Sequence, residues 1–227
     1  MIGPEFFGRT LVIAPHPDDE VLGTGGVLAR LADAGQETFV VVVTTGRPPA
    51  FTKQQTSMIR EEAYCVHKQL GVSQTFWLDQ PAAGLSEVPH SALNAAILKV
   101  MGEVSPQTLL IPFLGDIHVD HALTFLSTLV AARPNHGNFP TTVLTYETLS
   151  ETNWNAPYLT PNFVPNVFVD IENTLPRKLE AMRRYASQLR EAPHERSIEA
   201  ISALATVRGS TVYRRAAEAF VMVRHVA

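Results

Sequence analysis

The stretch TLVIAPHPDDEVL, residues 10–22, decides the fold of this chain. Its first five residues are aliphatic or β-branched and predict a strand over 10–14, and an apolar pattern with helical spacing starts at Val21. Between the strand and the helix lies a turn crowded with metal-seeking side chains: His16, Asp18, Asp19 and Glu20. In an open α/β sheet, ligands bind beyond the carboxyl ends of the strands. The stretch therefore predicts one half of a catalytic metal site.

The overall composition is that of an ordinary globular protein. The chain has 227 residues, of which 45% are hydrophobic and 18% are charged, so we expect one α/β domain over 1–227 with a substantial core. The formal net charge of −4 argues against a nucleic-acid partner, because such proteins usually present a basic face. The single cysteine, Cys65, excludes an intrachain disulfide and falls in a helical pattern, where we expect it to be buried.

The sequence contains no visible targeting or membrane-spanning segment. The first residues, MIGPE, have neither the basic region nor the apolar core of a signal peptide. No apolar run approaches the roughly 18 residues that a membrane helix needs. We therefore expect a cytoplasmic protein with no membrane partner.

Strand and helix patterns alternate along the rest of the chain. The expected strands are at residues 10–14, 38–44, 75–78, 107–112, 142–147, 166–171 and 219–224. The expected helices are at residues 21–34, 53–70, 89–104, 115–133, 174–189 and 194–207. The continuous apolar run FVVVV at 39–43 indicates a strand buried on both faces, which is typical of parallel sheets. The pattern predicts a Rossmann-like three-layer α/β/α sandwich with a mostly parallel sheet.

A second metal-seeking cluster follows the expected strand at 107–112. Its sequence is DIHVDH, residues 116–121, in which His118 and His121 are three residues apart and share one face if they begin a helix. Asp120 lies between the two histidines. Because this cluster also follows a buried strand, it opens at the same edge of the sheet as the first. We therefore expect the two clusters to converge into one metal site.

The residue types narrow the chemistry of this site. Asp18 and Asp19 are neighbours on a turn that enters a helix, so their side chains diverge, and we expect one to bind the metal and the other to face the substrate. Adding His16 and one histidine of the second cluster gives two imidazoles, one carboxylate and an open position. That set is typical of catalytic zinc and also resembles the two-histidine, one-carboxylate site of non-haem Fe(II), so the ligands alone leave the metal open.

These motifs carry a family resemblance. APHPDDEVLG at 14–23, followed by HVDH at 118–121, resembles the LmbE/PIG-L family of metal-dependent de-N-acetylases. Later segments resemble a bacterial branch of that family, among them YASQL at 185–189, RG at 208–209 and AEAF at 217–220. The resemblance implies a Rossmann-like fold and hydrolysis of the acetamide of an N-acetylglucosamine-containing molecule.

The resemblance also implies roles for single residues. The ligands of Zn²⁺, or of Fe²⁺ or another divalent transition metal, would be His16, Asp19 and His121. Asp18 would be the general base, taking a proton from water and returning it to the departing amine. His118 falls where the family has a non-ligating histidine that polarises the substrate carbonyl, with Asp120 as its partner. Val119 departs from the proline of many members, and Asp116 departs from the tyrosine with which some members help the oxyanion.

Further residues are expected to contact the substrate, which would be a small N-acetylated sugar or glycoconjugate. Arg60 stands where the family has an arginine in its second helix, Asp79 follows a strand, and Arg208 resembles a family arginine. The resemblance leaves a homo-oligomer open. Four histidines match no motif and are expected to be structural or surface residues: His67, His90, His136 and His225.

Three alternatives compete with a deacetylase. GTGG at 23–26, after a strand, is reminiscent of a nucleotide-binding Rossmann protein, but the GxGxxG spacing is missing and a phosphate would meet the acidic turn. The second alternative is an amidase or other metallohydrolase that acts on a non-sugar amide with the same site. The third is a non-catalytic metal-binding protein, against which the presence of a base beside the ligands argues.

Overall fold

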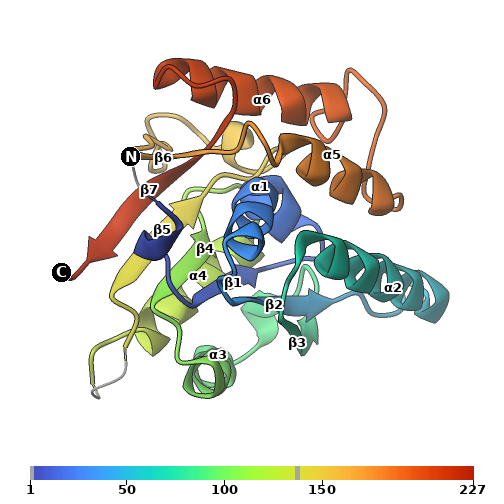
Figure 1. The fold of residues 1–227 in the computed structure, drawn as a ribbon. Coiled ribbons are helices and arrows are strands. Elements are labelled where there is room, and N and C mark those ends of the chain that lie inside the picture. The colour runs from blue at the N-terminus through green and yellow to red at the C-terminus, as the bar shows by residue number, and fades with distance from the viewer. Residues whose placement is uncertain (1–2, 136–138) are drawn as a thin grey trace.

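The strands of this protein form one sheet (Figure 1). The computed structural model describes residues 3–135 and 139–227, so His136 lies outside the described residues. Within them the strands are β1 (Thr10–Ala14), β2 (Thr38–Thr45), β3 (Gln74–Pro81), β4 (Thr108–Pro112), β5 (Thr142–Tyr146), β6 (Val167–Asp170) and β7 (Ala217–His225). Their order is β3-β2-β1-β4-β5-β7-β6, with β1 to β5 parallel and β7 antiparallel to both neighbours. The predicted mostly parallel sheet is confirmed.

Helices cover both faces of this sheet (Figure 1). The α-helices are α1 (Asp19–Asp33), α2 (Lys53–Leu70), α3 (His90–Val104), α4 (Val119–Ala131), α5 (Leu175–Arg184) and α6 (Ile198–Thr211). The first, second, fifth and sixth helices pack on one face, and α3 and α4 pack on the other. Short 3-10 turns lie in the connections at Pro4–Phe6, Leu85–Glu87 and Thr152–Trp154. The predicted three-layer sandwich is confirmed.

The central strand β1 shows why these residues make a buried parallel sheet. All five of its residues are buried. Val12 belongs to the core that includes α1 and α2, whereas Leu11 and Ile13 belong to the core that includes α3 and α4. Because side chains alternate across a strand, a continuous apolar run fills both cores. The acidic turn after β1 therefore starts from a support that is packed on both sides.

The glycines of α1 allow close packing of this helix. A Cβ atom added to Gly23 would lie 2.2 Å from the ring of Tyr146, and one added to Gly26 would lie 2.8 Å from Ile171. The hydroxyl of Tyr146 donates to the backbone oxygen of Ile13 at 2.8 Å, which fixes the ring. The GTGG sequence at 23–26 thus lies within α1 and serves packing.

The helix expected over 174–189 is shorter in the structure. It is α5 and ends at Arg184. Tyr185 leaves the helix because its ring is buried and its hydroxyl donates to Oε1 of Glu20 at 2.7 Å. The tyrosine therefore connects the end of α5 to the acidic turn.

The helix expected over 194–207 begins later than predicted. It is α6, which begins at Ile198 because the side chain of Ser197 accepts a hydrogen bond from the backbone nitrogen of Ala200 at 3.2 Å and caps the helix. Residues 185–197, called the 185–197 segment below, are not helical.

The expected burial of Cys65 is wrong, because this residue is exposed. It lies on α2, whose buried face consists of Ala63, Val66, His67 and Leu70. Position 65 lies off that stripe, so helical periodicity directs its side chain to solvent.

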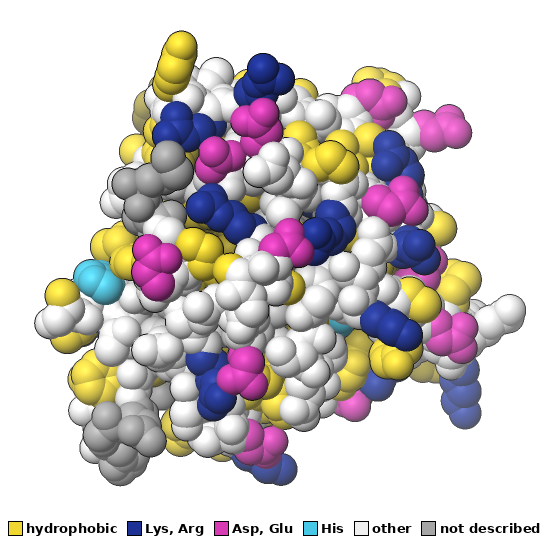
Figure 2. All heavy atoms as spheres, viewed as in Figure 1, with side chains coloured by type: hydrophobic (Ala, Val, Ile, Leu, Met, Phe, Trp, Pro, Cys, Tyr) yellow, Lys and Arg dark blue, Asp and Glu magenta, His cyan; other side chains and the backbone are white. Residues whose placement is uncertain are grey.

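The surface carries charges of both signs. On the face shown in Figure 2, Lys and Arg side chains are interspersed with Asp and Glu side chains. Exposed ion pairs join Arg177 to Asp33 at 2.9 Å and Arg215 to Glu172 at 3.4 Å. None of the described helices combines the length and the apolar character that crossing a membrane requires.

Candidate active site

The two acidic clusters meet at the carboxyl edge of the sheet. The first follows β1 and the second follows β4, and these strands are parallel neighbours, with Thr10 opposite Thr108. The other neighbour of β1 is β2, so the strand order reverses between β1 and β4, which is where open α/β sheets bind ligands. The predicted convergence of the two clusters is confirmed by this topology.

The acidic turn separates Asp18 from Asp19. Asp18 has φ 109° and ψ −26°, a left-handed conformation that costs a non-glycine residue about 1–3 kcal/mol. Its backbone nitrogen donates to Oε2 of Glu20 at 3.1 Å, and its backbone oxygen accepts from Leu22 at 2.9 Å. Asp19 opens α1, and its Oδ2 accepts from the backbone nitrogen of His16 at 2.8 Å. The two neighbouring aspartates are therefore held by different partners, Asp18 through its backbone and Asp19 through its carboxylate.

The buried side chain of Glu20 supports the acidic turn. Its side chain is fully buried, and its Oε1 accepts from the hydroxyl of Tyr185 at 2.7 Å and lies 3.1 Å from Nε2 of His67. Nδ1 of the same histidine lies 2.7 Å from Oγ1 of Thr75. His67 is thus a structural residue, and Glu20 supports Asp18 through the backbone.

Three donor atoms from the two clusters face one another. Oδ2 of Asp19 lies 3.2 Å from Nδ1 of His16 and 3.2 Å from Nε2 of His121, and the three atoms lie within 4.8 Å of one another. Nε2 of His121 is buried and has no hydrogen-bond partner among the described residues. Burial lowers the pKa of His121, but Asp19 and Asp116 outweigh it and raise this pKa to about 10. The negative potential of this position favours a cation.

The second nitrogen of each histidine is held by a carboxylate. Nε2 of His16 donates to Oδ2 of Asp120 at 3.1 Å, and Nδ1 of His121 donates to Oδ2 of Asp116 at 2.7 Å. Carboxylates in this position fix the tautomer and the ring orientation of metal-binding histidines. His16, Asp19 and His121, the ligand set that the family resemblance implies, could therefore hold a metal ion.

Asp120 is the partner of His16, which corrects the pairing with His118 expected from the resemblance. Its carboxylate also accepts from the backbone nitrogens of Ala83 at 2.7 Å and Leu85 at 3.2 Å. A second group of nearby donor atoms, formed by His16, His118 and Asp120, is thereby disfavoured as a metal site, because its carboxylate already accepts three hydrogen bonds.

His118 is a neutral imidazole that can donate a hydrogen bond from one ring nitrogen. It precedes α4, and its Nδ1 accepts from the backbone nitrogen of Asp120 at 3.1 Å. Burial, together with the nearby His16, lowers the pKa of His118 to about 4, so the ring is neutral at neutral pH. A neutral imidazole whose Nδ1 accepts carries its proton on Nε2.

The carboxyl of Asp18 lies in a buried, charged environment. Burial raises its pKa, and the guanidinium of Arg196, whose Nη1 lies 3.1 Å from Oδ2, opposes this rise. For Asp19, burial also raises the pKa, but His121 and His16 outweigh it and lower the pKa well below the usual range. The two aspartates therefore differ. Asp19 is an anion that faces the histidines, and Asp18 is a candidate proton acceptor that faces Arg196.

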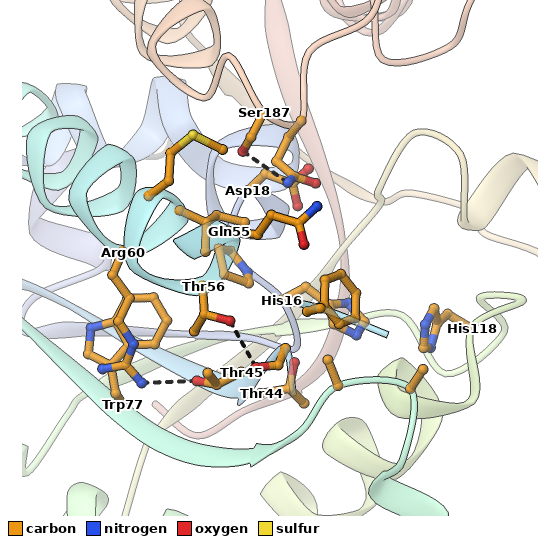
Figure 3. Close-up of a pocket in the computed structure, with 18 of the residues that line it drawn as sticks. His16, Asp18, Thr44, Thr45, Gln55, Thr56, Arg60, Trp77, His118 and Ser187 are labelled. Atoms are coloured by element: carbon orange, nitrogen blue, oxygen red, sulfur yellow. Dashed lines mark hydrogen bonds between the residues drawn. The ribbon is translucent and has the colours of Figure 1, made fainter. Parts of the chain in front are cut away.

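A cavity of about 480 Å³ opens beside the two clusters (Figure 3). In Figure 3, His16 and His118 lie on one side of it and Arg60 and Trp77 on the other. Helix α2 lines it with Gln55, Thr56, Met58 and Ile59. The 185–197 segment lines it with Ser187, Gln188, Arg190 and Arg196. The cavity thus connects the metal-seeking donors to a wall of mixed polar and apolar side chains that includes an aromatic ring.

The three residues expected to contact substrate lie in different places. Arg60 lines the cavity, and its guanidinium is ion-paired with Asp79 and lies 4.3 Å from the centre of the Trp77 ring. Asp79 does not line the cavity and acts on it through Arg60. Arg208 lies outside the cavity and makes two hydrogen bonds to Glu147, at 2.7 and 2.6 Å. We therefore keep Arg60 as a candidate contact, and treat Asp79 as its support and Arg208 as a structural residue.

Comparison with known proteins identifies the family. Residues 11–132 match the protein-family model of GlcNAc-PI de-N-acetylase, PIG-L. The chain belongs to this family. PIG-L membership confirms the predicted family and the predicted class of enzyme, an N-deacetylase that uses a metal ion.

Individual relatives of this PIG-L protein agree over most of its length. A diacetylchitobiose deacetylase of Thermococcus kodakarensis is 28% identical over 195 residues, 81% of this chain and 71% of the relative. The protein TT1542 of Thermus thermophilus has a TM-score of 0.79 at 25% identity and covers 96% of each chain. GalB, the 4-carboxy-2-hydroxymuconate hydratase of Pseudomonas putida KT2440, has a TM-score of 0.75 at 20% identity over 96% of this chain and 98% of that one. The last likeness concerns the fold alone, so activity has to be argued from the site.

Sequence reasoning missed two residues of this PIG-L site. Asp116 belongs to the second cluster, but the sequence analysis gives it no role beyond its departure from a tyrosine, whereas in the structure it holds His121. Arg196 has no motif around it and is 178 positions from Asp18, yet the two side chains are in contact. Only the tertiary path of the 185–197 segment reveals this contact.

Proposed function

We propose that this protein is a zinc-dependent N-deacetylase that hydrolyses the acetamide of an N-acetylglucosamine-type sugar or sugar conjugate. The observation that carries the proposal is the donor set of His16, Asp19 and His121, in which each histidine is held by a carboxylate on its other nitrogen. The buried Nε2 of His121, to which none of the described residues hydrogen-bonds, supports a cation at this point. Two nitrogens and one oxygen are a usual set of three protein ligands for catalytic Zn²⁺, whose fourth ligand is water or substrate.

The roles of Asp18 and His118 follow from their surroundings. When bound, a divalent ion would supply a Lewis acid that lowers the pKa of water to about 7. Asp18, which lines the cavity next to His16, takes a proton from the attacking water and later delivers it to the departing amine. His118 donates a hydrogen bond from its Nε2–H to the acetyl oxygen as negative charge develops there, and keeps its proton.

The substrate class is supported by the relatives and by the cavity. The relatives include a diacetylchitobiose deacetylase and a 2'-N-acetylparomamine deacetylase of Streptomyces fradiae, both of which are named for N-acetylated substrates. The cavity of about 480 Å³ falls within the range of about 300–1,000 Å³ that is usual for small-molecule sites. Arg60, held beside Trp77, supplies a guanidinium and an aromatic face for a polar ligand.

The test is acetate release from a panel of amides. N-acetylglucosamine, diacetylchitobiose, N-acetylglucosaminides and N-acetyl amino acids are each incubated with the protein, with and without a chelator and added Zn²⁺. We expect acetate from at least one sugar derivative, loss of release with chelator, and recovery with Zn²⁺. Release from N-acetyl amino acids alone would contradict a sugar substrate and favour the non-sugar amidase. Release that the chelator does not affect would contradict the dependence of the activity on a metal ion.

A further inference from the structure

Arg196 is in direct contact with the carboxylate of Asp18. It belongs to the 185–197 segment, and its Nη1 donates to Oδ2 of Asp18 at 3.1 Å. The side chain of Asp18 is only 1% exposed. Within the part of the chain that the structure describes, this is the one hydrogen bond to that carboxylate. The orientation of Asp18 about its side-chain bonds therefore depends on Arg196.

The guanidinium of Arg196 is itself fixed at two other points. Nε donates to Oγ of Ser150 at 2.8 Å, and Nη2 donates to Oε1 of Glu151 at 3.3 Å. Each of its three nitrogens thus has its own partner. The planar guanidinium makes these three contacts at once, which the single ammonium group of a lysine could not do in the same geometry. A neighbouring arginine, Arg190, also lines the cavity, but its Nη1 donates to backbone oxygens of its own segment.

The 185–197 segment that carries Arg196 is anchored along its length. The side-chain nitrogens of Asn153 and Trp154 donate to Glu195, and the backbone nitrogen of Ser187 donates to Glu62 of α2 at 3.1 Å. The last residue of the segment caps α6. Arg196 is therefore presented to Asp18 by a segment that is tied to α2 and to the 3-10 turn at Thr152–Trp154.

We propose that Arg196 is a positioning residue for the reaction: it holds Oδ2 of Asp18 and leaves Oδ1 free to exchange protons with the reacting atoms. This inference rests on the proposed function. It explains how a carboxylate on a left-handed backbone, beside a metal ligand, keeps one orientation through two proton transfers. Proton transfer requires the acceptor within hydrogen-bond reach of the proton, so a turned carboxylate loses turnover without losing substrate binding.

The expected effects separate positioning from substrate binding. A misplacement of about 1 Å costs about 100-fold in rate, so we expect Arg196→Ala to lower kcat about 100-fold with KM and zinc content unchanged. Arg196→Lys retains a charge but not the fork, so kcat should fall less than in Arg196→Ala and remain below wild type. Added guanidinium ion should raise kcat of Arg196→Ala, because it can occupy the site between Asp18 and Glu151.

The experiment measures kcat, KM and zinc content of wild type, Arg196→Ala, Arg196→Lys and a control, each with and without guanidinium. The control is Arg215→Ala, which removes an arginine that is 86% exposed and is not among the residues that line the cavity. It should behave as wild type and should not respond to guanidinium. Wild-type kcat in Arg196→Ala, a loss confined to KM, or a loss that guanidinium does not relieve would each overturn the proposal.

A structural measurement keeps the test independent of the substrate. In crystal structures of the zinc-loaded proteins, Asp18 should be ordered against Arg196 in wild type and should turn away or become disordered in Arg196→Ala. The same Asp18 conformer in both proteins would overturn the role of Arg196. If wild type releases no acetate from any substrate, the proposed function fails, and this comparison still decides the role of Arg196. Arg196→Lys serves in both measurements if the alanine variant does not fold.

Discussion

Replacing Asp116 by alanine tests how this fold positions His121, a proposed metal ligand. Nδ1 of His121 donates to Oδ2 of Asp116 at 2.7 Å, and Oγ1 of Thr152 donates to the other oxygen at 2.6 Å. The side chains of His121 and Asp116 are both fully buried. Without the carboxylate, the imidazole loses the contact that fixes its tautomer and its orientation toward Asp19.

The size of the effect follows from the role of this contact. Loss of a carboxylate that orients a ligating histidine typically weakens metal binding by about 10- to 100-fold. That range corresponds to about 1.4–2.7 kcal/mol, since tenfold is about 1.4 kcal/mol. In the metal-free protein, the unpaired buried N–H should also lower the free energy of unfolding by about 1–3 kcal/mol. Asp116→Asn keeps an acceptor oxygen, so its losses should be smaller.

The assay is competition for Zn²⁺ between the protein and a chelator of known affinity, with unfolding of the metal-free proteins in urea measured in parallel. The control is Asp33→Ala, which removes an exposed carboxylate paired with Arg177 at 2.9 Å and should leave zinc affinity unchanged. Wild-type zinc affinity in Asp116→Ala would refute the conclusion that this carboxylate holds the ligand.

Three further changes test single parts of the structure. Asp18→Asn removes the proton acceptor, so kcat for acetate release should fall about 100- to 10,000-fold while zinc content stays at the wild-type value; an unchanged kcat would contradict this role. His118→Ala removes the Nε2 donor and should lower kcat about 100- to 1,000-fold in steady-state kinetics, and a loss confined to KM would count against it. Gly23→Ala drives a methyl group into the ring of Tyr146 and should lower the free energy of unfolding by about 1–3 kcal/mol, whereas an unchanged urea midpoint would refute the close packing.

The parts of the site that the sequence predicts are those encoded locally. The strand over 10–14 and the helix after it could be predicted from apolar patterns, and parallel topology then brings the acidic turn to the edge where the second cluster emerges. The division between Asp18 and Asp19 also follows from their adjacent positions on a turn entering a helix. Local sequence was therefore enough to bring the candidate donors together, whereas the choice among them came from the family resemblance.

The contacts that support these residues could not be predicted. Asp120 is next to His121 in sequence but bonds to His16, because the pairing depends on how β1 and β4 align. The helix expected over 174–189 ends early because Tyr185 turns to Glu20, which is 165 positions away. The exposure of Cys65 and the start of α6 depend instead on local features, the apolar stripe of α2 and the cap at Ser197. Arg196 reaches Asp18 only through the path of the 185–197 segment, which has no sequence periodicity that fixes its course.

The most direct test of a metal-dependent N-deacetylase is a zinc titration of the metal-free protein with acetate release as the readout. We expect release to be absent without metal, to rise with bound Zn²⁺ and to saturate at one ion per chain. His121→Ala should neither bind this ion nor recover release, whereas His90→Ala, which removes an exposed histidine, should behave as wild type. Full acetate release by the metal-free protein, or by His121→Ala, would contradict the central claim.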